Sequence, residues 1–396
     1  MKKTIKFYLI CIIFLIAKWG YCQDSTTNKF GKGIAVVAKD SSFSMKFGLR
    51  VQSLLEISSP LRNDGNLYKD AETRFLIRRS RLKFDGFAYS PKLQYKVELG
   101  LSASDLSGAN DLTNNTPLLI LDAVVKWNFY RNFSVLIGQT KLPGNRERVI
   151  SSQQLQFVDR SIVNSRFNID RDAGFMLQHH FMINNIMIRE MASITTGEGR
   201  NITVEKRGGF DYTARVEILP FGSFTKGGDY VSSDIYREEK PKLSLALGYD
   251  YNDNAIRQGG QLGRIMDEER DLKTFITDMM FKYRGFSVMS EYIHKTTTIT
   301  PLVFDTEGVQ TGSFYTGKGF VIQGGYLFRN NFEVAGRYAT VIPEQVTQRE
   351  RMDQYTLGVS RYIVGHNLKI QSDVSYTKEG ADDQGLSYRF QVELAF

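Results

Sequence analysis

The sequence predicts an all-β fold, a transmembrane antiparallel β-barrel of about sixteen strands. Three observations lead to this fold. Segments of about ten residues alternate between apolar and polar side chains, and the links between these segments are short and long in turn. No segment beyond the N-terminal leader is long and apolar enough for a membrane helix. Soluble strands average five or six residues, whereas a tilted strand that crosses a bilayer needs about 9–11.

The first 22 residues are predicted to be a cleaved secretory signal. Three lysines precede an apolar run over residues 7–17, and small residues follow at Gly20 and Cys22. This run is too short for a bilayer span, which needs roughly 20 residues. The alternative is a lipoprotein that is acylated on Cys22. Tyr21 and the lack of a leucine followed by small residues ahead of the cysteine disfavour that alternative.

The expected mature chain has no cysteine, because Cys11 and Cys22 both lie in the leader. It would therefore hold neither disulfides nor thiolate metal sites. The net charge of the whole chain is +8, and the lysines of the leader supply about half of this excess. So small an excess argues against nucleic acid as a partner. Residues 23–42 are expected to form a periplasmic segment, and residues 43–396 are expected to form the barrel.

The predicted strands have one apolar face and one polar face. In the C-terminal stretch "LSYRFQVELAF", every second residue from Leu386 to Phe396 is apolar, and charged or polar residues occupy most positions between them. The terminal Phe396 suits recognition by the outer-membrane assembly machinery. The stretches 172–183 and 186–196 alternate less clearly. The sixteen strands are expected to begin near residues 43, 74, 92, 118, 132, 172, 186, 208, 241, 273, 286, 318, 331, 353, 367 and 386.

The links between the strands differ systematically in length. The short ones, "YSPK", "YRN", "NN", "RG", "RNN" and "GHN", consist largely of residues that favour tight turns. The link over residues 221–240 is long where a short one is due. The other long links are 58–73, 104–117, 142–170, 197–207, 253–272, 298–317, 342–352 and 379–385. This asymmetry is typical of outer-membrane barrels, which have short periplasmic turns and long external loops. A secreted soluble β-protein, such as a lectin or a lyase, is the alternative and does not explain it.

The stretch "RFLIRRSRLKFDG" is the most basic in the chain. Alternation places Arg79, Arg81 and Lys83 on the lumen face of a strand. Residues two apart on a strand are about 6.7 Å apart, which is within the screening length of ~8 Å at physiological salt. The three cations therefore share one positive field that attracts anions. Alternation does not explain Arg74 and Arg78. The alternation of other strands places further cations in the lumen. The anion-binding candidates among them are Arg50, Lys126, Arg215 and Arg337.

Five motifs together carry a resemblance to a known family. They are "RRSRLKFDG", "SPKLQYKVELGLS", "LLILDAVVKWNF", "FSVLIGQTKLPGNRERVISS" and "RDAGFML". They resemble the phosphate-selective porin O and P family over residues 43–396, most densely over residues 74–180. The resemblance implies a trimeric sixteen-stranded barrel with a basic constriction for phosphate or polyphosphate. The chain departs from the family pattern at Gly144 and Asn145, where an aromatic residue and a serine are usual, but it keeps Glu147.

The resemblance also implies that the link over residues 142–170 folds inward and narrows the channel. The predicted constriction residues are Arg146, Arg148, Arg160, Arg166 and Arg171. The alternative is a solvated loop in which these arginines pair with the acidic residues of the same segment.

The sequence predicts neither a catalytic site nor a cofactor nor a metal site. His179 and His180 point to opposite faces of one strand, and His366 lies in a tight turn. Ser290 and His294 share a face with one another, but this face is predicted to contact lipid.

The predicted function is an outer-membrane porin for passive diffusion of small anions, with phosphate or polyphosphate as candidates. The alternatives are a porin for sugars or organic acids, and an outer-membrane enzyme or adhesin on a barrel scaffold. The expected partners are outer-membrane lipids of a Gram-negative bacterium, small anions, two further copies of the chain in a homotrimer, and the assembly machinery.

Overall fold

Sixteen antiparallel strands form a closed barrel in the computed structural model, which describes residues 30–61, 71–381 and 383–396. The predicted leader, residues 1–22, lies outside this part of the chain. The barrel strands are β2 (Phe43–Pro60), β3 (Glu72–Ala88), β4 (Ser90–Gly100), β5 (Ile120–Tyr130), β6 (Phe133–Lys141), β7 (Arg171–Ile183), β8 (Ile186–Thr195), β9 (Asp211–Leu219), β10 (Lys242–Arg257), β11 (Ile265–Tyr283), β12 (Phe286–Thr297), β15 (Gly317–Leu327), β16 (Phe332–Pro343), β17 (Met352–Tyr362), β18 (Leu368–Glu379) and β19 (Asp383–Ala395).

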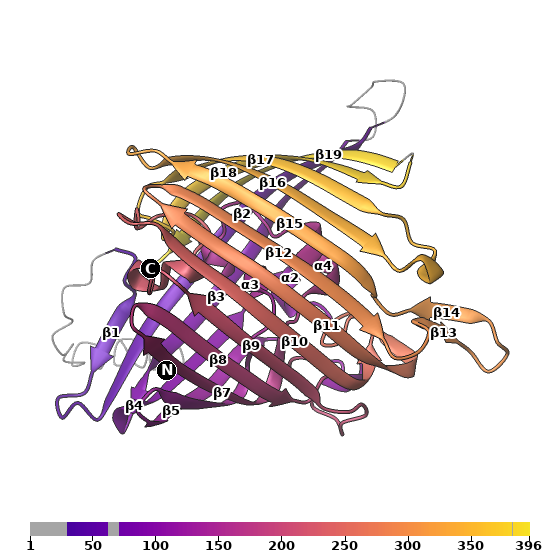
Figure 1. Cartoon of the computed structure of the whole chain (residues 1–396), viewed down its shortest axis with the longest axis horizontal. Coiled ribbons are helices and arrows are strands. Elements are labelled where there is room, and N and C mark those ends of the chain that lie inside the picture. Colours follow the sequence, from indigo (N-terminus) through magenta and orange to yellow (C-terminus); the bar gives the residue numbers. More distant parts are fainter. Residues whose placement is uncertain (1–29, 62–70, 382) are drawn as a thin grey trace, which may run out of the picture.

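Each barrel strand pairs with the next one along the chain, and β19 pairs with β2, so the sheet closes on itself (Figure 1). The predicted fold class and strand number are confirmed. The extent of one hairpin was predicted wrongly, because residues 253–272 were expected to be a long link. In the structure β10 pairs with β11 as far as Arg257 and Ile265. The outer end of β11 carries the unbroken polar run 267–271, so its sequence shows no alternation there.

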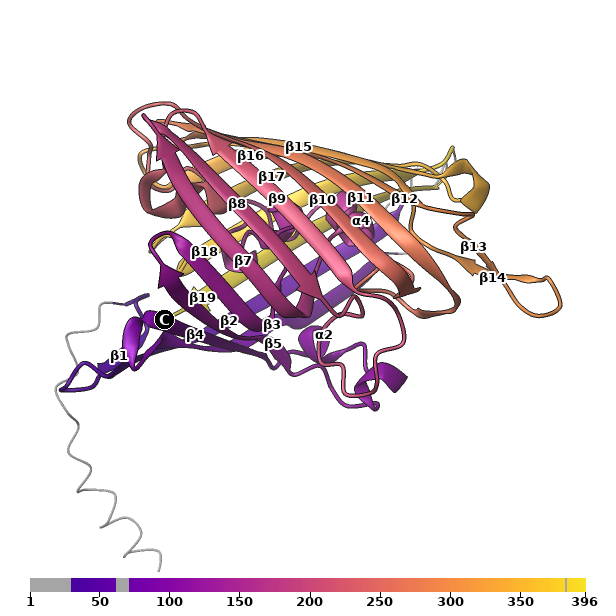
Figure 2. The same ribbon diagram turned by 60° about the horizontal axis from the view of Figure 1, so that its bottom comes forward.

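The two ends of the barrel differ in their links. Short turns such as Asn184–Asn185 lie at the end that carries the C-terminus, which we call the short-turn end (Figure 2). Asn184 has a φ of 53°, a left-handed conformation that asparagine tolerates well. A further strand, β1 (Ile34–Val37), pairs with β2 at this end, beyond the point where β19 stops. The opposite end, which we call the long-loop end, carries the projecting hairpin of β13 (Leu302–Phe304) and β14 (Gln310–Ser313).

The outer face of the barrel is mainly apolar. Phe175 and Leu177 on β7 are exposed, and so are Leu357 and Val359 on β17. Such a surface suits contact with lipid tails, where a charged side chain is costly. In the part of the chain that the structure describes, helices are short, and none is long and apolar enough to cross a membrane.

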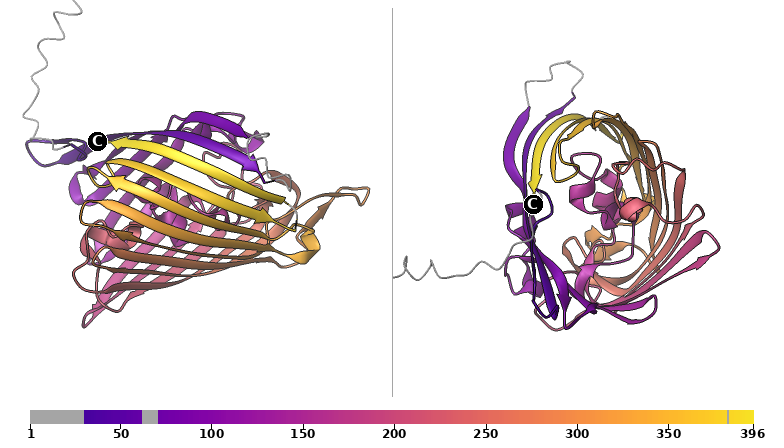
Figure 3. Two further views of the ribbon diagram at one scale, coloured as in Figure 1. Left: turned by 90° about the horizontal axis from the view of Figure 1, so that it is seen from above. Right: turned by 90° about the vertical axis from the view of Figure 1, so that its left-hand side faces the viewer.

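Two segments occupy the interior of the barrel (Figure 3). The first, residues 142–170, connects β6 to β7 and contains α3 (Arg146–Val149), η3 (Ser152–Gln154) and α4 (Ile162–Phe167). The second, residues 220–241, connects β9 to β10 and contains η4 (Thr225–Tyr230). Shorter helices in the long links are α2 (Ala103–Leu106), η2 (Asp111–Thr113) and η5 (Gln345–Thr347).

A hydrophobic core forms between the first inner segment and one side of the barrel wall. Val163 and Phe167 on α4 pack against buried apolar residues of the wall, including Ile276 on β11, Ile293 on β12 and Val321 on β15. Complete burial of one such side chain stabilises a protein by roughly 1.5–3 kcal/mol relative to exposure. The core therefore fixes the inner segment to the wall of β11, β12, β15 and β16 and leaves the interior free on the opposite side.

Candidate functional site: a basic cavity inside the barrel

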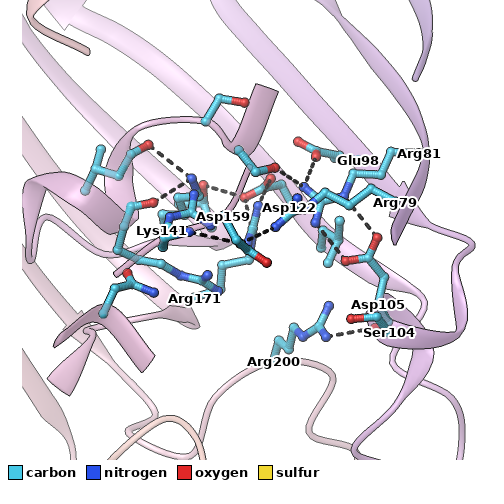
Figure 4. A pocket seen from close by; sticks show the side chains of 18 of the residues that line it. Arg79, Arg81, Glu98, Ser104, Asp105, Asp122, Lys141, Asp159, Arg171 and Arg200 are labelled. Atoms are coloured by element: carbon cyan, nitrogen blue, oxygen red, sulfur yellow. Dashed lines mark hydrogen bonds and ion pairs between the residues drawn. The ribbon is translucent and has the colours of Figure 1, made fainter. Parts of the chain in front are cut away.

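A cavity of about 660 Å³ lies between the first inner segment and the wall formed by β3 to β7 (Figure 4). Cations outnumber carboxylates in its lining by ten to four. The cations are Arg78, Arg79, Arg81, Lys96, Lys141, Arg148, Arg160, Arg171, Arg200 and Arg389, and the carboxylates are Glu98, Asp105, Asp122 and Asp159. These side chains come from β3 to β7 and from β19, and from the first inner segment. Asp105 and Arg200 come from long links at the long-loop end.

A bulge in β3 turns two consecutive arginines into this cavity. Gln52 on β2 pairs with Arg79, but the next residue of β2 pairs with Ile77, so Arg78 is an extra residue in β3. Both arginines bind the same carboxylate. Arg78 Nη2 lies 2.6 Å from Asp159 Oδ2, and Arg79 Nη2 lies 3.0 Å from Asp159 Oδ1. The bulge explains Arg78, which simple alternation does not, and it keeps Ile77 exposed on the outer face.

Asp159 links the first inner segment to this pair of arginines. Burial disfavours its ionised form, but the nearby charges of Arg79 and Arg78 outweigh this cost and hold the pKa of Asp159 well below its ordinary value. The carboxylate therefore stays charged at neutral pH and neutralises much of the field of the two arginines.

Arg81 is similarly paired. It donates two hydrogen bonds to Asp105, at 3.1 Å and 2.7 Å, and lies 3.2 Å from Glu98. It also lines a second cavity of about 300 Å³, together with Lys83 and Arg50. This second cavity reaches Phe396 and therefore extends toward the short-turn end. The predicted column of Arg79, Arg81 and Lys83 thus lines two cavities that share Arg81.

Three cations in the first cavity have no carboxylate partner among the described residues. Lys141 donates only to the carbonyl oxygens of residues 148–150, at 2.8–3.2 Å. Arg160 donates to the carbonyl oxygens of Glu147 and Ile150, and Arg200 donates to those of Asp105 and Leu118. Carbonyl groups satisfy hydrogen-bond donors but carry no net charge. No carboxylate therefore pairs directly with this group, which we call the unpaired triad.

The two arginines of the unpaired triad sit in an environment that disfavours their charge. Burial, together with the neighbouring charges of Arg148 and Arg79, lowers the pKa of Arg160, and burial lowers the pKa of Arg200 to about 10. Arg200 stays a cation at neutral pH, because its pKa remains well above 7. An anion in the cavity would relieve this repulsion, and the arrangement is therefore suited to attract anions.

Comparisons with known proteins agree with this architecture. The family model of phosphate-selective porin O and P matches residues 60–394. The chain belongs to this family. An uncharacterised protein of Aquifex aeolicus (strain VF5) is 24% identical, over 93% of this chain and 91% of that protein.

Solved structures share the fold of this porin at low identity. The outer membrane channel DcaP of Acinetobacter baumannii has a TM-score of 0.58 at 12% identity, covering 91% of this chain and 99% of its own. The anion-selective porin from Comamonas acidovorans has a TM-score of 0.55 at 10% identity, covering 89% of this chain and all of its own. The trimer form of OmpT of Vibrio cholerae has a TM-score of 0.54 at 12% identity, covering 90% of this chain and 100% of its own. The family and the fold support an outer-membrane channel.

The structure brings some of the predicted site residues together and separates others. Arg79, Arg81, Arg148, Arg160 and Arg171 line the first cavity. Arg148 pairs with Asp170, and Arg171 pairs with Asp122 at 3.2 Å. Lys83 and Arg50 line the second cavity, where Arg50 lies 2.6 Å from Glu393.

Five predicted residues lie outside both cavities. Arg215 was expected on the open pore lining, but it is buried beneath the first inner segment, 2.7 Å from Asp278 and 2.9 Å from Glu217. Arg146 contacts the same two carboxylates from the inner segment. The remaining three are Arg337, which donates to the Asp159 carbonyl, Arg166, which donates to the Tyr315 hydroxyl, and Lys126, which donates to Gln178.

Sequence reasoning missed two of the most informative cations, Lys141 and Arg200. Lys141 is the last residue of β6, where alternation no longer tells the direction of a side chain. Arg200 lies in a long link, and its position depends on how that link folds back over the barrel. In the part of the chain that the structure describes, no group of three histidine, cysteine or acidic side chains is arranged to hold a metal.

Proposed function

We propose that this porin conducts small anions, with phosphate and polyphosphate as preferred passengers, by passive diffusion through the basic cavity. The unpaired triad of Lys141, Arg160 and Arg200 is the observation that supports this proposal most strongly. Paired cations contribute little field at a distance, because their partner carboxylates cancel it. The triad adds cationic side chains that no carboxylate pairs directly, so the potential inside should be positive and favour anions over cations.

The lining also suits phosphate chemistry. Arginine offers a planar fork of donors that matches the oxygens of phosphate, and lysine offers a compact charge. The two cavities share Arg81, Lys96 and Glu98, so an anion that leaves the triad would meet Lys83 and Arg50 next. Several moderate sites in series allow an anion to enter and also to leave, which conduction requires.

The proposal extends to assembly and location. The leader, residues 1–22, would direct the chain across the inner membrane, and Phe396 would be read by the outer-membrane assembly machinery. Phe396 exchanges backbone hydrogen bonds of 2.9 Å and 3.0 Å with Leu49 at the short-turn end, where the barrel closes. By likeness to the trimer form of OmpT, we propose a homotrimer in contact with outer-membrane lipids.

A planar-bilayer recording of the purified porin tests the anion proposal. In a gradient of KCl the reversal potential should show that chloride is more permeant than potassium, and millimolar phosphate should reduce the chloride current. Cation preference would overturn the anion proposal. Anion preference without block by phosphate would leave a general anion channel, and block by organic acids instead of phosphate would indicate a different passenger.

A further inference from the structure

The link over residues 220–241 is an exception to the alternation of short and long links between barrel strands. It lies at the short-turn end, where every other link between barrel strands is brief. Its helical turn, η4, lies within the ring of strands when the barrel is viewed along its axis (Figure 3). Channel conduction along the basic cavity does not account for this segment, so it calls for a separate explanation.

Hydrogen bonds anchor the segment to the barrel wall. Lys282 on β11 is buried and donates through Nζ to the carbonyl oxygens of Val231 and Ser233, both at 2.7 Å. The amide of Gly285 donates to Asp234 Oδ2 at 2.7 Å, and Arg237 donates to the Leu327 carbonyl at 2.8 Å. These contacts reach the ends of β11, β12 and β15.

The same segment also bonds to the first inner segment. Arg146 Nη1 donates to the Asp229 carbonyl at 2.9 Å, and its guanidinium lies 5.5 Å from the ring centre of Tyr230. The amide of Ser232 donates to the Gln154 carbonyl at 3.0 Å. Tyr230 in turn donates to Glu217 on β9 at 2.7 Å.

An apolar cluster completes the attachment. Phe224 is buried with Ile150 and Leu155 of the first inner segment and with Met280 and Met289 of the wall. Opening the segment would expose this cluster. It would also break the two hydrogen bonds that Lys282 Nζ donates to the segment. The contacts therefore describe a fixed element rather than a hinged lid.

We propose that residues 220–241 form a permanent plug that closes the β9–β16 side of the short-turn mouth. The plug confines solutes to the side of β2 to β8, where the basic cavity lies. The inference rests on the proposed function only in that the barrel conducts ions.

Replacing residues 225–236 by a two-residue Gly-Ser link tests the plug. Single-channel conductance should rise severalfold, and anion preference should fall, because ions gain a route that bypasses the cavity. Shortening the tip of the β13–β14 hairpin, residues 305–310, is the control and should change neither property. Circular dichroism and heat-modifiable mobility on a gel identify variants that still form barrels. Unchanged conductance in a folded variant would overturn the plug.

This result is separable from the anion proposal. If the unmodified porin lacks anion preference, the proposed function fails, but a rise in conductance on removal of residues 225–236 would still support the plug.

A cross-link distinguishes a plug from a lid. The predicted mature chain has no cysteine, so the pair Gln154→Cys and Ser232→Cys can be oxidised selectively, with each single variant as a control. Conductance of the oxidised protein should equal that of the reduced protein, because a plug does not move. A current that falls on oxidation and returns with a thiol reductant would overturn the proposal and would indicate a moving lid.

Discussion

The two sides of the barrel wall have the same strand geometry but opposite inner surfaces. Along β3 to β7 the inward-facing side chains include Arg79, Arg81 and Asp122, and they border the cavity. Along β11 and β12 they include Ile276 and Met289, which are buried beneath the inner segments. Apolar inward-facing residues therefore mark where protein fills the barrel. Charged inward-facing residues occur on both sides, because Arg215, Asp278 and Lys282 are also buried beneath the inner segments.

The largest expected effect is on the covered side. Arg146→Ala would leave Asp278 and Glu217 with one cation fewer in a fully buried network, and loss of one partner of a buried ion pair costs about 3–5 kcal/mol. Barrel unfolding in urea, followed by tryptophan fluorescence, should show this destabilisation. Lys226→Ala, at an exposed position, is the control. Equal stability of the two variants would mean that Arg146 does not anchor the inner segment.

A somewhat smaller loss is expected from the apolar core. Ile293→Ala removes a fully buried side chain between the wall and the inner segment and should lower the free energy of unfolding by about 2–5 kcal/mol. Ile322→Ala, on the outward face of β15, should cost less, because lipid can fill the space that it leaves. The same urea titration measures both. An equal or greater cost at Ile322 would contradict the assignment of the two faces.

On the open side the expected effect is on selectivity rather than stability. Replacing Lys141, Arg160 and Arg200 together by Gln should lower the permeability ratio of chloride to potassium by roughly tenfold, because the uncompensated charge is removed. The reversal potential in a KCl gradient measures this ratio. Lys126→Gln, outside both cavities, should leave the potential unchanged. Retention of anion preference by the triple variant would show that the triad is not the source of selectivity.

The smallest effect is expected on mild acidification. The pKa of Asp159 in the folded protein lies well below its ordinary value of about 3.9. The stability that the ionised carboxylate contributes is therefore fully present above a pH of about 3.9. It is lost only when the pH falls through the lower folded-state pKa. The reversal potential should therefore change little between pH 7 and pH 5. A large change in the reversal potential between pH 7 and pH 5 that disappears in Asp159→Asn would contradict this. It would show that the carboxylate titrates in this range and is not held ionised by Arg78 and Arg79.

Much of the barrel follows directly from the sequence. Strict alternation in β2, β4 and β19 predicts strands, because a strand between lipid and water must present two different faces. Alternation fades in β11, where Ile276 and Met280 are apolar on the inward face as well. Apolar residues on both faces of a strand indicate that protein, rather than water, covers its inner face. Only the structure shows which segment covers it.

The site was less predictable than the fold. The Arg79–Arg81–Lys83 column follows from alternation, whereas Arg78 depends on a bulge that shifts the alternation by one residue. Arg215 lies on the inward face as alternation requires, yet the inner segment covers it. Lys141 and Arg200 owe their positions to the end of a strand and to a long link. Such positions are set by contacts between distant segments, and a pattern of neighbouring residues does not encode them.

A comparison of how accessible the two sides of the barrel are to a small charged reagent tests the confinement of solutes to one side. Ser165 on α4 is exposed and lines the basic cavity, whereas Ser287 on β12 is buried beneath the inner segment. Each is changed to Cys, and a negatively charged methanethiosulfonate is added during a bilayer recording. We expect rapid loss of current for Ser165→Cys and no change for Ser287→Cys. Equally rapid loss of current at Ser287→Cys would contradict the confinement of solutes to one side of the barrel.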